Sequence, residues 1–384
     1  MIHLLLAIIY LSFISLGLPD ALLGAAWPTV YPQFGVPVSA SGIIFITISM
    51  GTVVSSLLSD RLTRRFGPGK VTAVSVALTA AALFGFASSH SFWMLWAWAI
   101  PYGLGAGGVD AALNNYVALH YESHHMSWLH CMWGIGASVG PYIMGAVLAG
   151  GGVWNAGYLV VGLIQTALVA VLFFSLPLWK GAGHSEETAP SKPLTIGQIF
   201  AIPGALEILI AFFCYCALEQ TAGLWASSYL VLNRGLDETA AAGFAGLFYL
   251  GITAGRFFNG FLAMKLPDAA LIRMGLGIIG IGGVLLLIPG NSFFALAGLV
   301  ILGLGCAPIY PCIIHSTPDH FGAENSQALI GVQMASAYIG NILMPPLFGL
   351  IANHLGIALF PAYLLAILAL MTWMHEQVLC KTAH

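Results

Sequence analysis

The chain has 384 residues, of which 59% are hydrophobic and only 7% are Asp, Glu, Lys or Arg, and its formal net charge is −3. Soluble domains carry about 25% charged residues, so this composition excludes a soluble globular fold. The chain also has 46 Gly and 19 Pro, residue types that are frequent in transmembrane helices. The composition therefore predicts an all-α membrane protein.

The apolar segments in chain order predict twelve transmembrane helices, since a span needs about 20 predominantly apolar residues. The first six are expected at 4–29, 39–59, 70–89, 92–117, 127–149 and 154–178. The polar segment Lys180–Lys192 then predicts a cytoplasmic linker. Six more spans follow at 203–231, 240–263, 268–289, 293–316, 326–352 and 355–375. We therefore expect an N-terminal bundle of residues 1–178, a linker of 179–197 and a C-terminal bundle of 198–384.

The basic residues predict the orientation in the membrane, because Lys and Arg are enriched in cytoplasmic loops. With the N-terminus inside, ten of the eleven Lys and Arg residues face the cytoplasm and only Arg234 lies outside. Arg256 is counted among the cytoplasmic ten. We therefore expect a multi-pass protein of the cell (inner) membrane, in contact with lipid, with both termini in the cytoplasm.

The two predicted bundles carry matching glycines. Gly51 matches Gly251, Gly103 matches Gly303 and Gly140 matches Gly340, each at an offset of 200 residues. Asp20-x3-Gly24 matches Glu219-x3-Gly223 at an offset of 199. Parallel repeats of six spans are how major facilitator transporters are built, with the substrate site near the bilayer midplane between the halves. The pattern predicts two pseudo-symmetric six-helix bundles.

Three motifs resemble the major facilitator superfamily, and the resemblance covers the whole chain. Ser56-Leu-Leu-Ser-Asp60-Arg61, followed by Arg64, is similar to the cytoplasmic signature loop, although Ser56 stands where that pattern has Gly. Gly255-Arg256 resembles the counterpart of this loop in the second half, and Gly136-x3-Gly140-Pro141-x3-Gly145 resembles a small-residue motif of several branches. The resemblance implies a cytoplasmic gate formed by Asp60, Arg61, Arg64 and Arg256.

Within that superfamily the chain resembles the fucose permease branch of proton-coupled sugar symporters. Gly17-Leu-Pro-Asp20 is similar to the first-span aspartate motif of that branch, and Gly108-Val-Asp110-Ala-Ala-Leu-Asn114 is similar to its fourth-span segment. His130-Cys-Met-Trp133 falls where the branch has sugar-contacting side chains. Asp110 replaces the Glu of the branch, and His130 and Trp133 replace amides.

Three acidic residues lie deep inside predicted spans: Asp20, Asp110 and Glu219. A charged side chain at the bilayer centre costs about 2.5–3.5 kcal/mol on insertion scales, so such residues are candidates for function. None has an evident Lys or Arg partner, and a carboxyl group in an apolar site exchanges protons near neutral pH. We predict that Asp20 and Asp110 take up and release the coupling proton and that Glu219 contributes to coupling or binding. The alternative is that these acids serve helix packing alone.

Amide, indole, imidazole and phenol groups are the expected substrate contacts. Amides both donate and accept hydrogen bonds, as sugar hydroxyls do, and an indole offers a flat apolar face and one N–H donor. Ordinary hydrogen bonding between helices is the alternative for each residue. No Lys or Arg is expected deep in the cavity, which argues against an anionic substrate. The candidates are Asn114, His130, Trp133, Gln220, Trp225, Tyr310, Gln333 and Asn341.

These features together predict a secondary active transporter rather than an enzyme. The favoured function is proton-coupled symport of a neutral monosaccharide-like solute by alternating access, performed by a monomer. A proton-coupled efflux antiporter for lipophilic or cationic molecules is the alternative, followed by a membrane receptor and an intramembrane enzyme. The six cysteines lack metal-ligand spacing, so no metal or cofactor is expected. The coupling ion is expected to be a proton, with sodium left open, and no nucleic-acid partner is expected.

Overall fold

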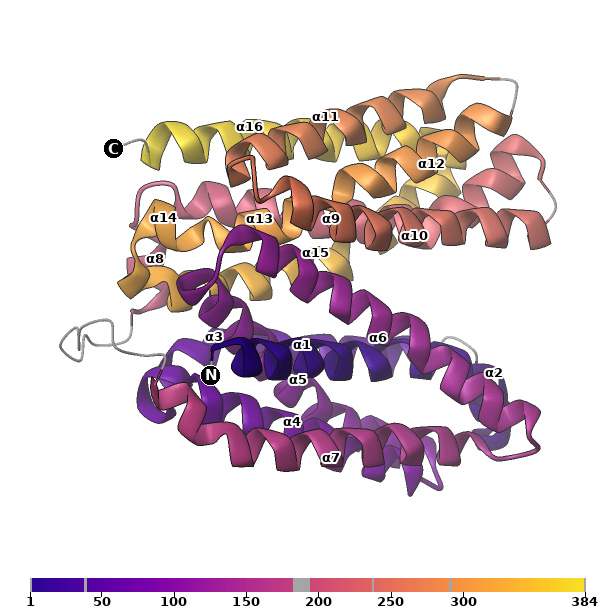
Figure 1. The fold of residues 1–384 in the computed structure, drawn as a ribbon. Coiled ribbons are helices and arrows are strands. Elements are labelled where there is room, and N and C mark those ends of the chain that lie inside the picture. Colours follow the sequence, from indigo (N-terminus) through magenta and orange to yellow (C-terminus); the bar gives the residue numbers. More distant parts are fainter. Residues whose placement is uncertain (1, 38–39, 182–193, 237, 290–291, 383–384) are drawn as a thin grey trace. The chain divides into compact units, whose positions relative to one another are not determined.

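The structure is a computed structural model that describes residues 2–37, 40–181, 194–236, 238–289 and 292–382 (Figure 1). Within these ranges all regular elements are helices and none is a strand. The predicted all-α fold is therefore confirmed. Residues 182–193, which make up most of the predicted linker, lie outside the described residues.

The described chain divides into two compact units. The first unit comprises Met1–Tyr116 and Leu129–Pro193, and the second comprises Val117–Trp128 and Leu194–His384. The short segment Val117–Trp128 therefore belongs by its contacts to the second unit, although the sequence on both sides of it belongs to the first. Each unit is described by itself below.

The helices of the first unit follow the six predicted spans. The first span is divided into two helices, and each of the other five is a single helix. In chain order they are α1 (Ile2–Asp20), α2 (Leu22–Phe34), α3 (Ser41–Phe66), α4 (Pro68–Ala87), α5 (Phe92–His120), α6 (Ser123–Ala149) and α7 (Trp154–Gly181).

The helices of the second unit likewise follow the other six spans, and the fourth of these is divided into two helices. In chain order the elements are α8 (Ile196–Phe200), α9 (Ala205–Arg234), α10 (Glu238–Leu262), α11 (Asp268–Leu287), α12 (Ser292–Cys306), α13 (Ile309–His315), α14 (Thr317–Phe321), α15 (Ala323–Leu355), the 3-10 helix η2 (Ile357–Leu359) and α16 (Phe360–Thr382). In Figure 1, α11 lies beside α12 and α16, and it packs against both.

Ten helical segments among the described residues are long and apolar enough to cross a membrane. Helices α5 and α10, of 29 and 25 residues, are long as well but do not belong to the ten. Helix α5 is rich in Trp, Tyr, Gly and Pro, which lower its mean hydropathy. The protein is a multi-pass membrane protein.

The first span contains a break that the sequence analysis does not predict. Helix α1 ends at Asp20 and α2 begins at Leu22. Pro19 has no backbone N–H, so the carbonyl of Ser15 loses its helical donor. Gln165 of α7 replaces that donor, since its Nε2 donates to the Ser15 carbonyl at 2.7 Å. The Oε1 atom of Gln165 accepts from Thr79 of α4 at 3.0 Å, so one amide ties three helices together near the break.

Glycines of α6 allow this helix to approach α1 closely. A Cβ atom added at Gly136 would overlap the carbonyl oxygen of Ile14, and one added at Gly140 would overlap that of Leu18. Small residues permit such backbone contact between membrane helices. The small-residue motif of α6 therefore serves packing against α1, and this contact sets the positions of Asp20 and Trp133.

Equivalent glycines make equivalent contacts in the two units. In the first unit a Cβ at Gly103 would overlap the carbonyl oxygen of Ile48, and in the second a Cβ at Gly303 would overlap that of Phe248. The two contacted residues are also 200 positions apart in the sequence. The predicted internal repeat is therefore confirmed at the level of helix packing.

Candidate functional site

Asp20 lies at the break between α1 and α2, where its carboxylate is exposed and accepts two hydrogen bonds from aromatic side chains. The indole Nε1 of Trp133 on α6 donates to Oδ2 at 2.8 Å, and the hydroxyl of Tyr102 on α5 donates to Oδ1 at 3.2 Å. Among the described residues Asp20 makes no ion pair. Neutral donors hold this carboxylate in place without neutralising its charge.

Asp110 on α5 is covered by two other predicted site residues. The Asn114 amide nitrogen, one turn further along the helix, donates to Asp110 Oδ1 at 2.7 Å and to its backbone carbonyl at 3.0 Å. The Asn114 amide oxygen faces His130 Nε2 of α6 at 3.0 Å. The exposed fractions are 7% for Asp110, 0% for Asn114 and 5% for His130. Phe13 of α1 packs edge-on against the His130 ring.

The two carboxylates are close enough to interact electrostatically. Five predicted residues of the first unit therefore lie in one polar site: Asp20, Trp133, Asp110, Asn114 and His130. The site contains an exposed acid and a buried acid. Neither acid makes an ion pair in the described part of the chain.

Tyr102 is a site residue that sequence reasoning missed. Its ring is 4% exposed, and its hydroxyl is directed at Asp20. It precedes Asp110 by eight residues on the same helix, which is about two turns and places the two side chains on neighbouring faces. No spacing in the sequence links Tyr102 to Asp20, because the two residues lie on different helices 82 positions apart.

Glu219 has a cationic partner, contrary to the sequence-based expectation. Arg256 Nη2 of α10 lies 3.8 Å from Glu219 Oε1 of α9. Arg256 is 4% exposed, and its place in a cytoplasmic gate stays a prediction. The burial of this cation is explained by the carboxylate beside it, because a buried charge is tolerated when it is paired. The expectation that Glu219 has no Lys or Arg partner is therefore wrong, and the argument against an anionic substrate loses that support.

Three of the predicted substrate contacts in the second unit form hydrogen bonds with other residues of the protein. The Trp225 indole donates to the backbone carbonyl of Pro345 at 3.0 Å. The Gln333 side chain, 0% exposed, exchanges hydrogen bonds with Thr317 at 3.1 and 3.2 Å. Tyr310 directs its hydroxyl at the sulfur of Met334 at 3.1 Å. These hydrogen bonds fit the packing alternative, and substrate contact stays a prediction for all three residues.

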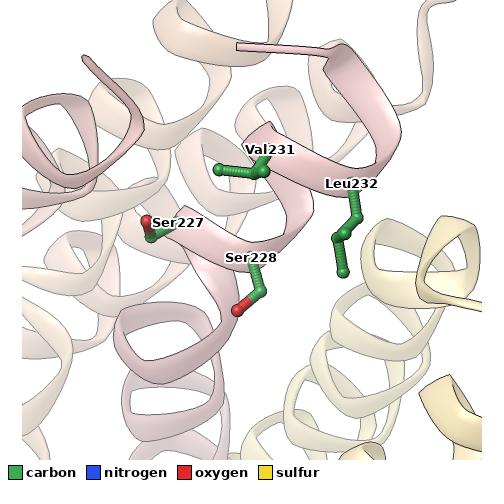
Figure 2. Close-up of a pocket in the computed structure, with 4 residues that line it drawn as sticks. All are labelled: Ser227, Ser228, Val231 and Leu232. Atoms are coloured by element: carbon green, nitrogen blue, oxygen red, sulfur yellow. The ribbon is translucent and has the colours of Figure 1, made fainter. Parts of the chain in front are cut away.

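Gln220 and Asn341, the other two candidates in the second unit, are half-buried, and the Asn341 Oδ1 atom is buried with no hydrogen-bond partner among the described residues. Gln220 lies on the same face of α9 as Ser227, because seven residues complete about two turns. A hollow further along this helix is lined by Ser227, Ser228, Val231 and Leu232 (Figure 2). The Gln220 face of α9 therefore continues into a partly polar hollow.

Asp60 forms an ion pair within its own helix. Arg64 Nε donates to Asp60 Oδ1 at 2.7 Å, four residues away on α3. Asp60 is 5% exposed and its Oδ2 atom has no partner in the described structure. Arg61 is exposed. The pairing joins two of the predicted gate residues.

The segment Val117–Trp128 is held in the second unit by a network around Asp268, the first residue of α11. Asp268 accepts from the Ser123 hydroxyl, and its Oδ2 lies 2.6 Å from Nδ1 of His315 at the end of α13. His315 Nε2 donates to the Tyr121 carbonyl at 3.0 Å. Ser127 accepts from Asn259 of α10 at 2.8 Å. Sequence reasoning missed this network because its members are far apart in the chain.

Comparison with known proteins places the chain in a family. A family model described as Major Facilitator Superfamily matches residues 9–292 and 244–378. "Bypass of stop codon protein 6" of Saccharomyces cerevisiae is 24% identical over 94% of this chain and 80% of the yeast protein. The glucose/mannose transporter GlcP of Bacillus subtilis is 19% identical over 79% of this chain and 77% of that protein.

The fold is similar to that of FucP. A structure of FucP in the outward conformation superposes with a TM-score of 0.80 at 15% identity, covering 97% of each chain. A structure of a variant of the E. coli fucose:proton symporter FucP superposes with a TM-score of 0.75 over 97% of this chain and 98% of that one. At such identity the likeness shows the fold alone. Because the family model matches most of this chain, the chain belongs to the Major Facilitator Superfamily of transporters.

Proposed function

We propose that the protein is a proton-coupled symporter of a neutral, monosaccharide-like solute that works by alternating access. The observation that carries the proposal is the pair of acids in the first unit. Asp20 is exposed and hydrogen-bonded to Trp133 and Tyr102, whereas Asp110 is buried beneath Asn114. An ionised carboxylate without a cationic partner leaves its site negatively charged. Proton binding makes that site neutral, which is the change that a coupling group must undergo.

The exposed acid and its aromatic neighbours support the sugar class. The indole N–H of Trp133 is directed at Asp20, and an indole face is suited to stacking against the apolar side of a sugar ring. Proton binding at Asp20 weakens its hold on the indole, so the position of Trp133 depends on the charge of Asp20. The similar proteins GlcP and FucP, a glucose/mannose transporter and a fucose:proton symporter, favour the same class.

The acid of the second unit, Glu219, differs from the two acids of the first unit because it has a cationic partner. Glu219 is already neutralised by Arg256, so we assign it to binding or conformational coupling and not to proton uptake. Because Arg256 is a buried cation, sugar acids belong in the substrate panel beside neutral sugars. Proton-coupled efflux of lipophilic or cationic molecules is the second candidate, since two uncompensated acids in the first unit also suit a cationic substrate.

The test is external pH in lightly buffered, de-energised cells that express the protein. Hexoses, pentoses, deoxyhexoses and sugar acids are added one at a time, with and without sodium. We expect alkalinisation with one neutral sugar, independent of sodium and absent in Asp20→Asn and Asp110→Asn at equal surface expression. A flat trace for every sugar contradicts symport, and uptake that requires sodium contradicts the proton as coupling ion.

We also propose that the protein resides in the cell membrane with both termini in the cytoplasm and functions as a monomer. The orientation rests on the distribution of Lys and Arg. Labelling of Cys380 from one side of the membrane tests it.

A further inference from the structure

We infer that Asn114 is a fixed amide that keeps the proton of neutral His130 on Nε2 and directs the proton of Asp110 to Oδ2. His130 is then a positioning residue that does not relay protons to Asp110. The role in coupling rests on the proposed function, whereas the tautomer follows from the hydrogen bonds alone.

The orientation of the Asn114 amide is set by two acceptors on one residue. Its nitrogen donates to the backbone carbonyl of Asp110 at 3.0 Å and to Oδ1 of the same residue at 2.7 Å. A backbone carbonyl only accepts hydrogen bonds. Turning the amide over would place its oxygen against that carbonyl with no proton between them. The nitrogen therefore faces Asp110 whether or not Asp110 carries a proton.

The fixed amide determines which nitrogen of His130 is protonated. With the nitrogen of Asn114 facing Asp110, its oxygen faces His130 Nε2 at 3.0 Å and needs a donor there. Asn114 is 0% and His130 5% exposed, so an unmade hydrogen bond at this place is costly. His130 Nε2 must carry a hydrogen, and in the neutral ring Nδ1 is then the acceptor.

The same contact distinguishes the two oxygens of Asp110. Oδ1 accepts from Asn114 in both protonation states. In a protonated carboxyl group the carbonyl oxygen is the better acceptor, so the oxygen that faces the amide stays the carbonyl and the proton binds the other, Oδ2. Proton exchange at Asp110 therefore takes place on the side away from Asn114.

Asn114 also lies between His130 and Asp110 and does not pass protons from one to the other. An amide accepts at oxygen and donates at nitrogen, so passing a proton along this chain would require its unstable imidic acid form. Through Asn114, His130 thus influences Asp110 by holding the amide in place. This distinguishes positioning from relay, the two functional roles that a histidine near a coupling acid can have.

The decisive measurement is nitrogen NMR of the purified full-length protein with ¹⁵N-labelled imidazole rings, without any substrate. The His130 signals are identified as those missing from His130→Gln. We expect Nε2 of His130 to remain protonated across the whole pH range in which the protein is folded, in wild type and in Asp110→Asn alike. A His130 ring with its single proton on Nδ1, or a tautomer that changes as Asp110 titrates, overturns the inference.

Two variants test the part played by Asn114. Asn114→Leu keeps the volume but removes the amide, and we expect the Nε2–H tautomer to lose its preference. Asn115→Leu is the matched control, because Asn115 is the next residue of α5 and is 6% exposed, and we expect the His130 signals of wild type. Unchanged signals in a folded Asn114→Leu protein contradict the inference.

A transport experiment tests the absence of a relay. Glutamine at position 130 can donate from its amide to Asn114, so whatever sugar uptake His130→Gln retains should still be accompanied by alkalinisation with the wild-type pH profile. D-glucose, D-xylose and L-fucose serve as probes. Loss of proton coupling with intact sugar exchange assigns a relay to His130 and contradicts the inference. Should wild type respond to no sugar, the proposed function fails while the NMR result still decides the tautomer.

Discussion

At the scale of single residues, the two acids of the first unit differ in what surrounds them. Asp20 is exposed and held by two aromatic donors, whereas Asp110 is 7% exposed and held by one amide. Glu219 differs from both because Arg256 lies 3.8 Å away. Three acids that look alike in sequence therefore have three different electrostatic environments.

Trp133 is expected to combine two tasks, substrate stacking and donation to Asp20. Trp133→Phe keeps an aromatic face but removes the donor, so we expect a KM close to wild type with a lower maximal rate. Trp133→Ala also removes the face, worth about 1 kcal/mol, and should raise KM about fivefold. Initial rates of sugar uptake measure both values. Equal KM values for the two variants would exclude stacking on this ring.

The buried pair of Glu219 and Arg256 should respond strongly to the loss of one partner. Arg256→Met leaves an uncompensated carboxylate, and removing one member of a buried pair costs about 3–5 kcal/mol. We expect a clear decrease in thermal stability in detergent, with partial recovery in the double variant Arg256→Met, Glu219→Gln. Thermal unfolding followed by fluorescence tests this. A double variant less stable than Arg256→Met would show that the two side chains do not compensate each other.

At the scale of elements, backbone contact between α1 and α6 brings the site together. Gly136 and Gly140 lie against the carbonyls of Ile14 and Leu18, and the break in the first span places Asp20 where α1 ends. Trp133 reaches Asp20 from α6 because the two helices are this close. The site geometry thus depends on residues that have no polar side chain.

Gly140→Ala is therefore expected to disturb the site without removing any of its polar groups. The added Cβ overlaps a backbone carbonyl, which cannot rotate away, so the helices must separate at a cost of about 1–3 kcal/mol. We expect lower thermal stability and reduced transport. Gly145→Ala is the matched control on the same helix, since its Cβ meets nothing within 4 Å, and it should behave as wild type. Equal effects of both variants would exclude this packing argument.

The segment Val117–Trp128 should depend on Asp268 for its order. Asp268→Asn weakens the contacts to Ser123 and His315, so we expect faster amide hydrogen exchange in residues 117–128, measured by mass spectrometry. Glu207→Gln is the control, because Glu207 pairs with Lys381 elsewhere in the second unit. Unchanged exchange in Asp268→Asn would mean that apolar contacts alone hold the segment.

At the scale of the whole molecule, one native cysteine reports on orientation. All six cysteines are free, five are buried, and only Cys380, near the C-terminus, is exposed. A membrane-impermeant maleimide should therefore label inverted membranes but not intact cells, if the C-terminus is cytoplasmic. Cys380→Ser should abolish the labelling. Labelling of intact cells at Cys380 would contradict the proposed orientation.

The sequence by itself determined the features that depend on local composition and spacing. Apolar length determined the spans, since any helix that crosses a bilayer must be about 20 residues long. The repeat was evident because Gly51, Gly103 and Gly140 recur 200 residues later as Gly251, Gly303 and Gly340. Asp20 and Asp110 stood out because unpaired acids are rare within apolar segments.

Only the tertiary structure decided which side chains meet. The pairing of Glu219 with Arg256, the contact of Tyr102 with Asp20 and the break after Asp20 depend on how helices rotate and approach each other. Hydropathy carries no information about rotation when a helix is apolar on all sides. Partners far apart in the chain are brought together by glycine contacts and by the satisfaction of buried polar groups, and those conditions are met only in the folded protein.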